Sequence, residues 1–265
     1  MLIGRVAYNR KTLSVIYVSE EKKVYEIYAP IEKALSAMDT EIDISGTGIE
    51  IEKVQILPPV KPSKIICIGR NYEAHAKELG NEVPSEPMIF FKPPSCIIGT
   101  NSNVIYPKVS EQVDYEGEIA LVIKKVIKNI DAKHVRRNPQ NFFGYTAFLD
   151  MTARDIQKKE KLWTKAKGFD TFGPLGPWIE LDPIRESLAI KTFVNNEERQ
   201  SGNTKDMIFD FATIIEYISK IMTLEVGDVI ATGTPEGVGS VSIGDKVKVE
   251  IDGLIPLEIK IVEEK

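Results

Sequence analysis

The amino-acid sequence predicts a β-rich α+β fold. Most of the chain consists of short apolar runs of strand composition separated by turn residues, and few segments repeat apolar residues at helical spacing. The chain has 265 residues, 43% of them hydrophobic, which suffices for one large domain and a small one. We therefore expect short strands to dominate, with a few helices packed on them.

The beginning of the chain predicts a small β-rich unit. Apolar runs at 13–18 and 24–27 alternate with turns, and the residues at 31–38 predict a helix. The segment Pro58-Pro59-Val60-Lys61-Pro62 then predicts a stiff linker, because proline restricts the backbone.

This linker divides the chain into a small N-terminal domain, residues 1–60, and a catalytic domain, residues 61–265. In the second domain we expect many short strands and one clear helix, which Asp206 opens and whose apolar residues recur at helical spacing as far as Ile221. Those apolar residues are most simply core. Turns separate β-rich runs in the tail, at Gly227-Asp228, Gly244-Asp245 and Asp252-Gly253.

Two carboxylates lie at the edge of a predicted buried strand. The segment Asp114-Tyr115-Glu116-Gly117-Glu118 continues directly into the apolar run 119–123. Because side chains alternate along a strand, Glu116 and Glu118 point to one face, and both faces become apolar within a few residues. A solvated polar face is the ordinary reason for such a pair. Partly buried like charges need neutralising, however, and a divalent cation is the simplest neutraliser.

A third carboxylate, Asp150, ends another strand-like run at 142–149. The residues after it predict a helix, because Thr152 and Asp155 are spaced as a capping box. The three carboxylates have no Cys or His cluster beside them. Oxygen ligands alone suit a hard cation, so we expect Mg²⁺ at this site, with Mn²⁺ or Ca²⁺ as alternatives.

His75 and Glu78 are three residues apart, so on a helical turn they share a face. A carboxylate that hydrogen-bonds one imidazole nitrogen orients the ring and makes the other nitrogen a better base. The alternative is a solvated surface helix at 72–79 in which neither residue has a role. The other histidine, His134, lies in the basic stretch 133–137 and is assigned no role.

Composition excludes several classes of protein. The net charge of −5 gives no electrostatic footprint for nucleic acid, and no apolar run is long enough to span a membrane. The first five residues lack the apolar core of a signal peptide. Cys67 and Cys96 lie in apolar surroundings, where buried free thiols are expected. We therefore expect a cytoplasmic protein.

These motifs resemble the fumarylacetoacetate hydrolase family, in its branch of acylpyruvate hydrolases and 2-hydroxyhepta-2,4-diene-1,7-dioate isomerases. The matches run in family order from about residue 61 to the C-terminus, whereas the residues before them match only loosely. The matching stretches are residues 68–78, 88–94, 114–123, 149–157, 167–178, 203–209 and 232–239. Position 149 is Leu where the family often has Asn.

The resemblance implies a mixed β-sandwich roll with the metal near one end of the sheets, and a homodimer. It also implies that His75 and Glu78 activate a water molecule, and that their segment orders when substrate binds. The polar stretch at 77–86 fits such a lid, and we expect residues 72–84 to close over a bound 2-oxo acid.

The resemblance further implies a set of substrate contacts. Lys167 would place its ammonium at the substrate's oxygens, and Gln157 and Thr234 would donate hydrogen bonds to a substrate carboxylate. Arg154 lies three residues before Gln157, and would contact the substrate or clamp a carboxylate such as Asp150 or Asp155. Arg70 is a weaker candidate for contact with the distal end of the substrate.

The expected function is hydrolysis of the C–C bond of 3-acylpyruvates, such as fumarylpyruvate or acetylpyruvate, through a metal-stabilised pyruvate enolate. The alternatives are a 2-hydroxyhepta-2,4-diene-1,7-dioate isomerase, an oxaloacetate decarboxylase or tautomerase, and, ranked below them, a sugar-acid dehydratase. A catalytically silent metal-binding protein is the alternative from a different class. His75 and Glu78 favour hydrolysis over isomerisation, and the intact carboxylate set argues against a silent protein.

Overall fold

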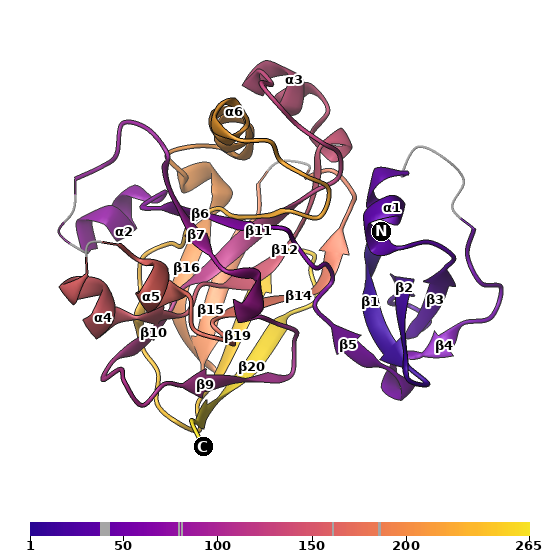
Figure 1. Ribbon diagram of the computed structural model, residues 1–265, viewed down its shortest axis with the longest axis horizontal. Helices are drawn as coiled ribbons and strands as arrows, with labels where there is room; N and C mark the ends of the chain where they lie inside the picture. The colour runs from indigo at the N-terminus through magenta and orange to yellow at the C-terminus, as the bar shows by residue number, and fades with distance from the viewer. Residues whose placement is uncertain (38–42, 79, 81, 161, 185–186) are drawn as a thin grey trace.

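Two strand-rich regions make up the computed structural model, a large body and a smaller N-terminal region beside it (Figure 1). The described residues are 1–37, 43–78, 80, 82–160, 162–184 and 187–265. The β-rich α+β class that the sequence predicts is confirmed. The boundary at residue 60 between two domains stays a prediction.

The strands are numbered in chain order. They are β1 (Leu2–Tyr8), β2 (Lys11–Val18), β3 (Lys23–Ile27), β4 (Ile49–Glu50), β5 (Gln55–Leu57), β6 (Ile65–Gly69), β7 (Met88–Lys92), β8 (Ile97–Ile98), β9 (Ser102–Tyr106), β10 (Val113–Tyr115), β11 (Gly117–Ile123), β12 (Phe143–Leu149), β13 (Thr152–Ala153), β14 (Gly173–Glu180), β15 (Ala189–Val194), β16 (Glu197–Asn203), β17 (Val229–Ala231), β18 (Gly239–Ser240), β19 (Lys246–Ile251) and β20 (Leu257–Glu263). The α-helices are α1 (Ile31–Ser36), α2 (Glu73–Glu78), α3 (Ala132–Arg137), α4 (Arg154–Lys159), α5 (Thr164–Lys167) and α6 (Phe211–Ile221).

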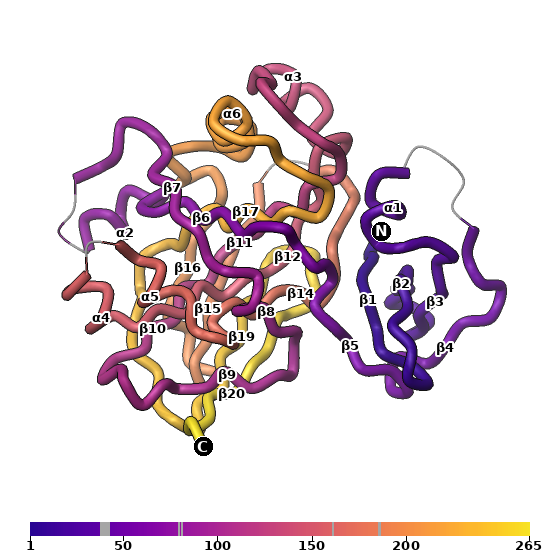
Figure 2. Tube along the Cα trace, in the orientation of Figure 1, coloured from indigo at the N-terminus to yellow at the C-terminus, as the bar shows by residue number. Residues whose placement is uncertain are grey.

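One large sheet runs through both regions, in the order β4-β3-β2-β1-β14-β12-β11-β17-β6-β7. The N-terminal strands join it because β1 pairs with β14, with Leu2 opposite Glu180. A second sheet of five strands, in the order β16-β15-β19-β20-β9, packs against β11, β12 and β14. The C-terminal strand β20 pairs with β9 in parallel, and Figure 2 shows the two strands side by side at the bottom of the body.

Strand β11 is buried on both of its faces, as its apolar run predicts. Ile119 and Leu121 enter the core between the two sheets, which α6 also covers with Ile214 and Ile218. Ala120 and Val122 enter a second core on the other face, closed by apolar residues of α1 and the N-terminal strands. The alternation expected from the sequence is confirmed, and it fixes the direction in which Glu118 points.

Some predicted helix boundaries are wrong. The long helix begins at Phe211 and not at Asp206, because Asp210 is the N-cap and accepts a hydrogen bond from the Thr213 amide at 2.8 Å. Asp206 lies in a preceding 3₁₀ turn. The helix predicted at 31–38 ends at Ser36, and its last position lies outside the described residues.

The capping box predicted at Thr152 and Asp155 is also wrong. Thr152 belongs to β13, which pairs with β10, and its hydroxyl donates to the Asp150 carbonyl. The following helix, α4, begins at Arg154 and has no side-chain cap. The Asp155 carboxylate instead accepts a hydrogen bond from the Ser110 hydroxyl at 2.7 Å.

The register of the large sheet brings several strand ends together. Gly117 at the start of β11 lies opposite Leu149 at the end of β12. The end of β17 lies at the same edge, because the amide of Thr232, the residue after β17, donates to the Ile119 carbonyl in β11. The Asp150 amide in turn donates to the Glu116 carbonyl. Residues that follow or precede these strands therefore meet at one edge.

Two further predictions concern membranes and thiols. Along the described residues, no helix has both the length and the apolar character to cross a membrane. Cys67 and Cys96 are both buried free thiols, as expected from their apolar surroundings. Burial raises the pKa of the Cys96 thiol to about 11, which keeps it protonated at neutral pH.

Candidate active site

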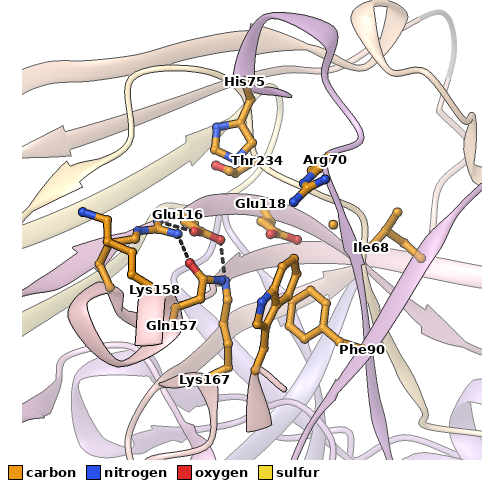
Figure 3. A pocket seen from close by; sticks show the side chains of 13 residues that line it. Ile68, Arg70, His75, Phe90, Glu116, Glu118, Gln157, Lys158, Lys167 and Thr234 are labelled. Atoms are coloured by element: carbon orange, nitrogen blue, oxygen red, sulfur yellow. Dashed lines mark hydrogen bonds and ion pairs between the residues drawn. The ribbon is translucent and has the colours of Figure 1, made fainter. Parts of the chain in front are cut away.

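A cavity of about 260 Å³ opens at this edge of the large sheet (Figure 3). Glu116, Glu118 and Lys167 lie at its floor and His75 lies above them. An apolar side is formed by Phe90 and by Trp163, whose rings meet edge to face at 5.1 Å. The cavity therefore combines a charged floor with an aromatic wall, as small polar ligands require.

The three predicted metal ligands come together: Glu116 and Glu118 line the floor, and the fully buried Asp150 lies against them. Glu116 fills the one-residue break between β10 and β11, Glu118 is the second residue of β11, and Asp150 directly follows β12. One carboxylate oxygen from each lies within 4.8 Å of the others, and all three residues are buried. This spacing is suitable for one divalent ion with oxygen ligands.

Two cations already contact this group. The Lys167 ammonium, at the end of α5, donates to Glu116 Oε2 and Asp150 Oδ2, each at 2.7 Å. Arg154, at the start of α4, contacts the other Glu116 oxygen. Burial acts to raise the pKa of Glu116, but Lys167 and Arg154 outweigh it and hold that pKa well below its usual range.

A third cation, Lys92, was not predicted. It ends β7, is 1% exposed, and donates to Asp150 Oδ1 at 2.7 Å and to the Met151 carbonyl at 3.1 Å. Both oxygens of Asp150 thus have a cationic partner. The only sequence signal was a lysine that ends an apolar run just before Pro93-Pro94, and such a lysine is normally solvated.

Glu118 differs from the other two carboxylates. Among the described residues it has no cationic partner, and it accepts one hydrogen bond, from the Gly233 amide at 2.8 Å. Burial, followed by the charges of Asp150 and Glu116, raises its pKa well above the usual range. The missing positive charge is what a divalent cation would supply, so the residues present fit a metal ion.

The predicted pair of His75 and Glu78 lies on α2, and Figure 3 shows the His75 ring above the floor. His75 is 5% exposed, and its Nδ1 lies 3.3 Å from Glu78 Oε2. Glu78 is itself held by the Gly237 amide, which contacts its two oxygens at 3.0 and 3.2 Å. In the tautomer in which Nδ1–H donates to Glu78, the Nε2 nitrogen is left as the acceptor.

Arg154 acts as a clamp, but on other carboxylates than the sequence suggested. It contacts Asp114 at 2.7 Å and Glu116, and not Asp150 or Asp155. Its third contact is the side-chain oxygen of Gln157. Because that oxygen faces Arg154, the amide nitrogen of Gln157 remains to donate toward the cavity.

The side chain of Thr234 is less available than predicted. Its hydroxyl donates to the Gly117 carbonyl at 2.8 Å and accepts from the Gln200 amide at 2.7 Å. A hydroxyl has a single proton, so this one cannot also donate to a substrate carboxylate while both bonds hold. Thr234 lines the cavity, and its contact with substrate stays a prediction.

His134 lies away from the cavity, and part of the predicted lid lies outside the described residues. His134 is an exposed residue of α3 and does not line this cavity. The lid predicted at 72–84 includes positions 79 and 81, which lie outside the described residues. Its described part contains the short helix α2, and its closure stays a prediction.

Comparison with known proteins identifies the class of protein that carries this site. Residues 64–262 match the family described as fumarylacetoacetate (FAA) hydrolase C-terminal. The chain therefore belongs to this family, and it is an enzyme of it.

Three related proteins have names that refer to an activity. The chain is 44% identical to a mitochondrial oxaloacetate tautomerase of Arabidopsis thaliana, over 75% of this chain and 91% of the relative. It is 45% identical to a mitochondrial oxaloacetate decarboxylase of Dictyostelium discoideum, over 72% of this chain and 89% of the relative. The crystal structure of a 2-hydroxyhepta-2,4-diene-1,7-dioate isomerase from Mycobacterium marinum superposes with a TM-score of 0.87 at 34% identity, covering 100% of this chain and 99% of that one.

Proposed function

We propose that this protein hydrolyses the C–C bond of 3-acylpyruvates with the help of a divalent cation, most simply Mg²⁺. The contact between His75 and Glu78 above three buried carboxylates carries the proposal, because hydrolysis requires both an activated water and a stabilised enolate. Isomerisation or decarboxylation of a 2-oxo acid needs a stabilised enolate but no activated water.

Glu116, Glu118 and Asp150 would hold the ion. When bound, the ion would supply Lewis-acid stabilisation for the negative charge that grows on the enol oxygen of the substrate. Lys167 remains a cation beside it: burial acts to lower its pKa, but Asp150 and Glu116 outweigh this and raise it. Two hydrogen bonds to carboxylates leave one ammonium proton of Lys167 for a substrate oxygen.

His75 would supply the base. His75 Nδ1–H would donate a hydrogen bond to Glu78, and Nε2 would accept a proton from water as the water oxygen bonds to the distal acyl carbon. The bond between that carbon and the neighbouring methylene then breaks, and its electron pair passes into the pyruvate enolate. Protonation of the enolate carbon gives pyruvate, and the acyl fragment leaves as a carboxylic acid.

The distal group of the substrate would meet one of two unpaired cations. Arg70 and Lys158 line opposite sides of the cavity (Figure 3). Neither makes an ion pair or hydrogen bond with any described residue, whereas Arg154 and Lys167 are paired with carboxylates. A substrate with a second carboxylate, such as fumarylpyruvate, would neutralise such a charge. We therefore expect it to be preferred over acetylpyruvate.

Oxaloacetate is the second candidate substrate. Two relatives that are 44% and 45% identical carry the names oxaloacetate tautomerase and oxaloacetate decarboxylase. The same floor of carboxylates and Lys167 would stabilise the enolate of oxaloacetate. This reaction would take place at the metal site alone, so His75 would have no essential role.

A coupled assay for pyruvate release decides between these reactions. The substrates are fumarylpyruvate, acetylpyruvate and oxaloacetate, each with Mg²⁺ and with a chelator, and oxaloacetate tautomerisation is followed separately by the absorbance of the enol. We expect Mg²⁺-dependent release from the acylpyruvates. Turnover of oxaloacetate alone would replace our proposal with the second candidate.

A further inference from the structure

Gln200 is a buried residue on a strand that is otherwise largely exposed. It is 1% exposed, whereas its neighbours on β16 at 199 and 201 are exposed. The pairing of β15 with β16 shifts register here, since Thr192 lies opposite Gln200 but Phe193 lies opposite Glu198. Such a bulge re-aims a side chain, and here it directs Gln200 toward the residues that support the metal ligands.

The side chain of Gln200 is fully engaged. Its Oε1 accepts from the Gly117 amide at 3.0 Å, and its Nε2 donates to Thr234 Oγ1 at 2.7 Å and to the Pro235 carbonyl at 2.9 Å. The Thr234 hydroxyl completes the ring by donating to the Gly117 carbonyl at 2.8 Å. Both peptide groups of Gly117 are therefore fixed, directly or through Thr234.

Gly117 is the residue between the two glutamate ligands. A Cβ atom at this position would lie 2.0 Å from the hydroxyl oxygen of Thr192, so the backbone here touches β15. The orientation of the Gly117 peptide groups sets the direction in which Glu116 and Glu118 leave the chain. Gln200 thereby acts on both ligands without touching either.

The same strand supports the other half of the site. Gly237, whose amide holds Glu78, has a φ of 91°, and a Cβ there would lie 2.1 Å from the Arg199 carbonyl. Pro235, on the same loop, is tied to Gln200. The loop at 233–237 thus lies against β16 and links the floor of the cavity to the partner of His75.

We propose that Gln200 is a positioning residue: it fixes the spacing of Glu116 and Glu118 for a divalent cation and anchors the loop at 233–237. This inference rests on the proposed metal site. Outer groups that orient metal ligands change metal affinity or activity by about 10–100-fold when they are removed. Its hydrogen bonds to two peptide groups and one hydroxyl give Gln200 this kind of role.

Titration calorimetry with Mn²⁺ on the metal-free protein tests the proposal without relying on activity. Gln200→Leu keeps the approximate size of the side chain and removes its hydrogen bonds, and we expect the Mn²⁺ Kd to rise about 10–100-fold. The matched control is Thr192→Val. Thr192 touches the same glycine, but its hydroxyl has no hydrogen-bond partner among the described residues, so the Kd should not change.

Two further outcomes separate the inference from the proposed function. Absence of Mn²⁺ binding to the unaltered protein would overturn the metal site and the inference together. If the unaltered protein binds Mn²⁺ and Gln200→Leu has the same Kd, the inference alone is overturned. The inference is also overturned if Thr192→Val weakens Mn²⁺ binding as much as Gln200→Leu does. Should Gln200→Leu not fold, Thr234→Val breaks the same ring at its other member. Weaker Mn²⁺ binding by Thr234→Val would support the inference, and an unchanged Kd would overturn it.

Discussion

The floor of the cavity and the helix above it are built differently. Asp150 and Glu116 accept ion pairs on both of their oxygens, and they are 0% and 5% exposed at the ends of a large sheet. His75 and Glu78 lie on a six-residue helix and are 3.3 Å apart, and the Glu78 side chain is 35% exposed. The floor is fixed by many buried contacts, whereas the proposed base, His75, has few.

This difference suggests a division of work. Charge stabilisation depends on groups that do not reorganise during reaction, and a sheet edge with buried ion pairs provides them. Activation of water depends on the position of one ring, and the predicted closure of α2 would set that position. Substitutions in the two regions should therefore have separable effects, and the following predictions test this separation.

The largest loss of activity is expected from Glu118→Gln. The substitution removes the one floor carboxylate without a cationic partner among the described residues, so metal-dependent turnover should fall by more than about 100-fold. Because the change replaces a buried carboxylate that has no ion-pair partner among the described residues, stability toward urea in a chelator should not decrease. Glu197→Gln, at an exposed residue of β16, is the control and should retain full turnover.

Substitution of His75 should affect one reaction more than another. His75→Ala should lower acylpyruvate hydrolysis by about 10²–10⁴-fold, the usual contribution of a general base. Metal-assisted decarboxylation of oxaloacetate needs no activated water and should lose much less. The other histidine provides the control, since His134→Ala should change neither reaction. Equal losses of both activities in His75→Ala would refute the division of work.

Lys92→Met should mainly lower stability. It leaves Asp150 buried with one cationic partner in place of two, and breaking a buried ion pair costs about 3–5 kcal/mol. The free energy of unfolding in urea measures this loss. Lys165→Met removes an exposed pair with Glu160 and should cost less than about 1 kcal/mol. A similar small cost for Lys92→Met would show that the buried lysine is not required to hold Asp150.

The smallest effect is expected outside both regions. Asp210→Ala removes the N-cap of α6 and should cost about 1 kcal/mol, whereas Asp206→Ala should cost little. Burial acts to raise the pKa of Asp210, but its hydrogen bonds with Arg136 and Thr213 lower it. The stabilisation is therefore present above the ordinary Asp pKa of about 3.9 and is lost as the pH falls through the folded pKa. Urea titrations at pH 7 and pH 3 should show the difference between the two variants narrowing in acid.

The clustering of the floor carboxylates could be predicted from the sequence because its signals are local, whereas their role as metal ligands stays a prediction. Glu116 and Glu118 are separated by one residue at the start of an apolar run, so strand alternation alone places them together. Asp150 ends the strand-like run at 142–149, which is also apolar. Burial on both faces of β11 then follows from composition, and the structure confirms it.

The contacts that the sequence did not predict join distant parts of the chain. Lys92 and Asp150 are 58 positions apart, and Gln200 and Gly117 are 83 apart. Arg154 contacts Asp114 and not Asp150 or Asp155 because β13 pairs with β10, which no local pattern indicates. The same pairing takes Thr152 into a strand and removes the predicted capping box.

A side-by-side Mn²⁺ titration of the metal-free unaltered protein, Glu118→Gln and His75→Ala tests the central claim most directly. We predict that the unaltered protein binds one ion, that Glu118→Gln loses this binding, and that His75→Ala keeps the original Kd. Unchanged binding in Glu118→Gln would contradict the assignment of the floor. A loss in His75→Ala as large as that in Glu118→Gln would contradict the separation of the metal-binding floor from the base.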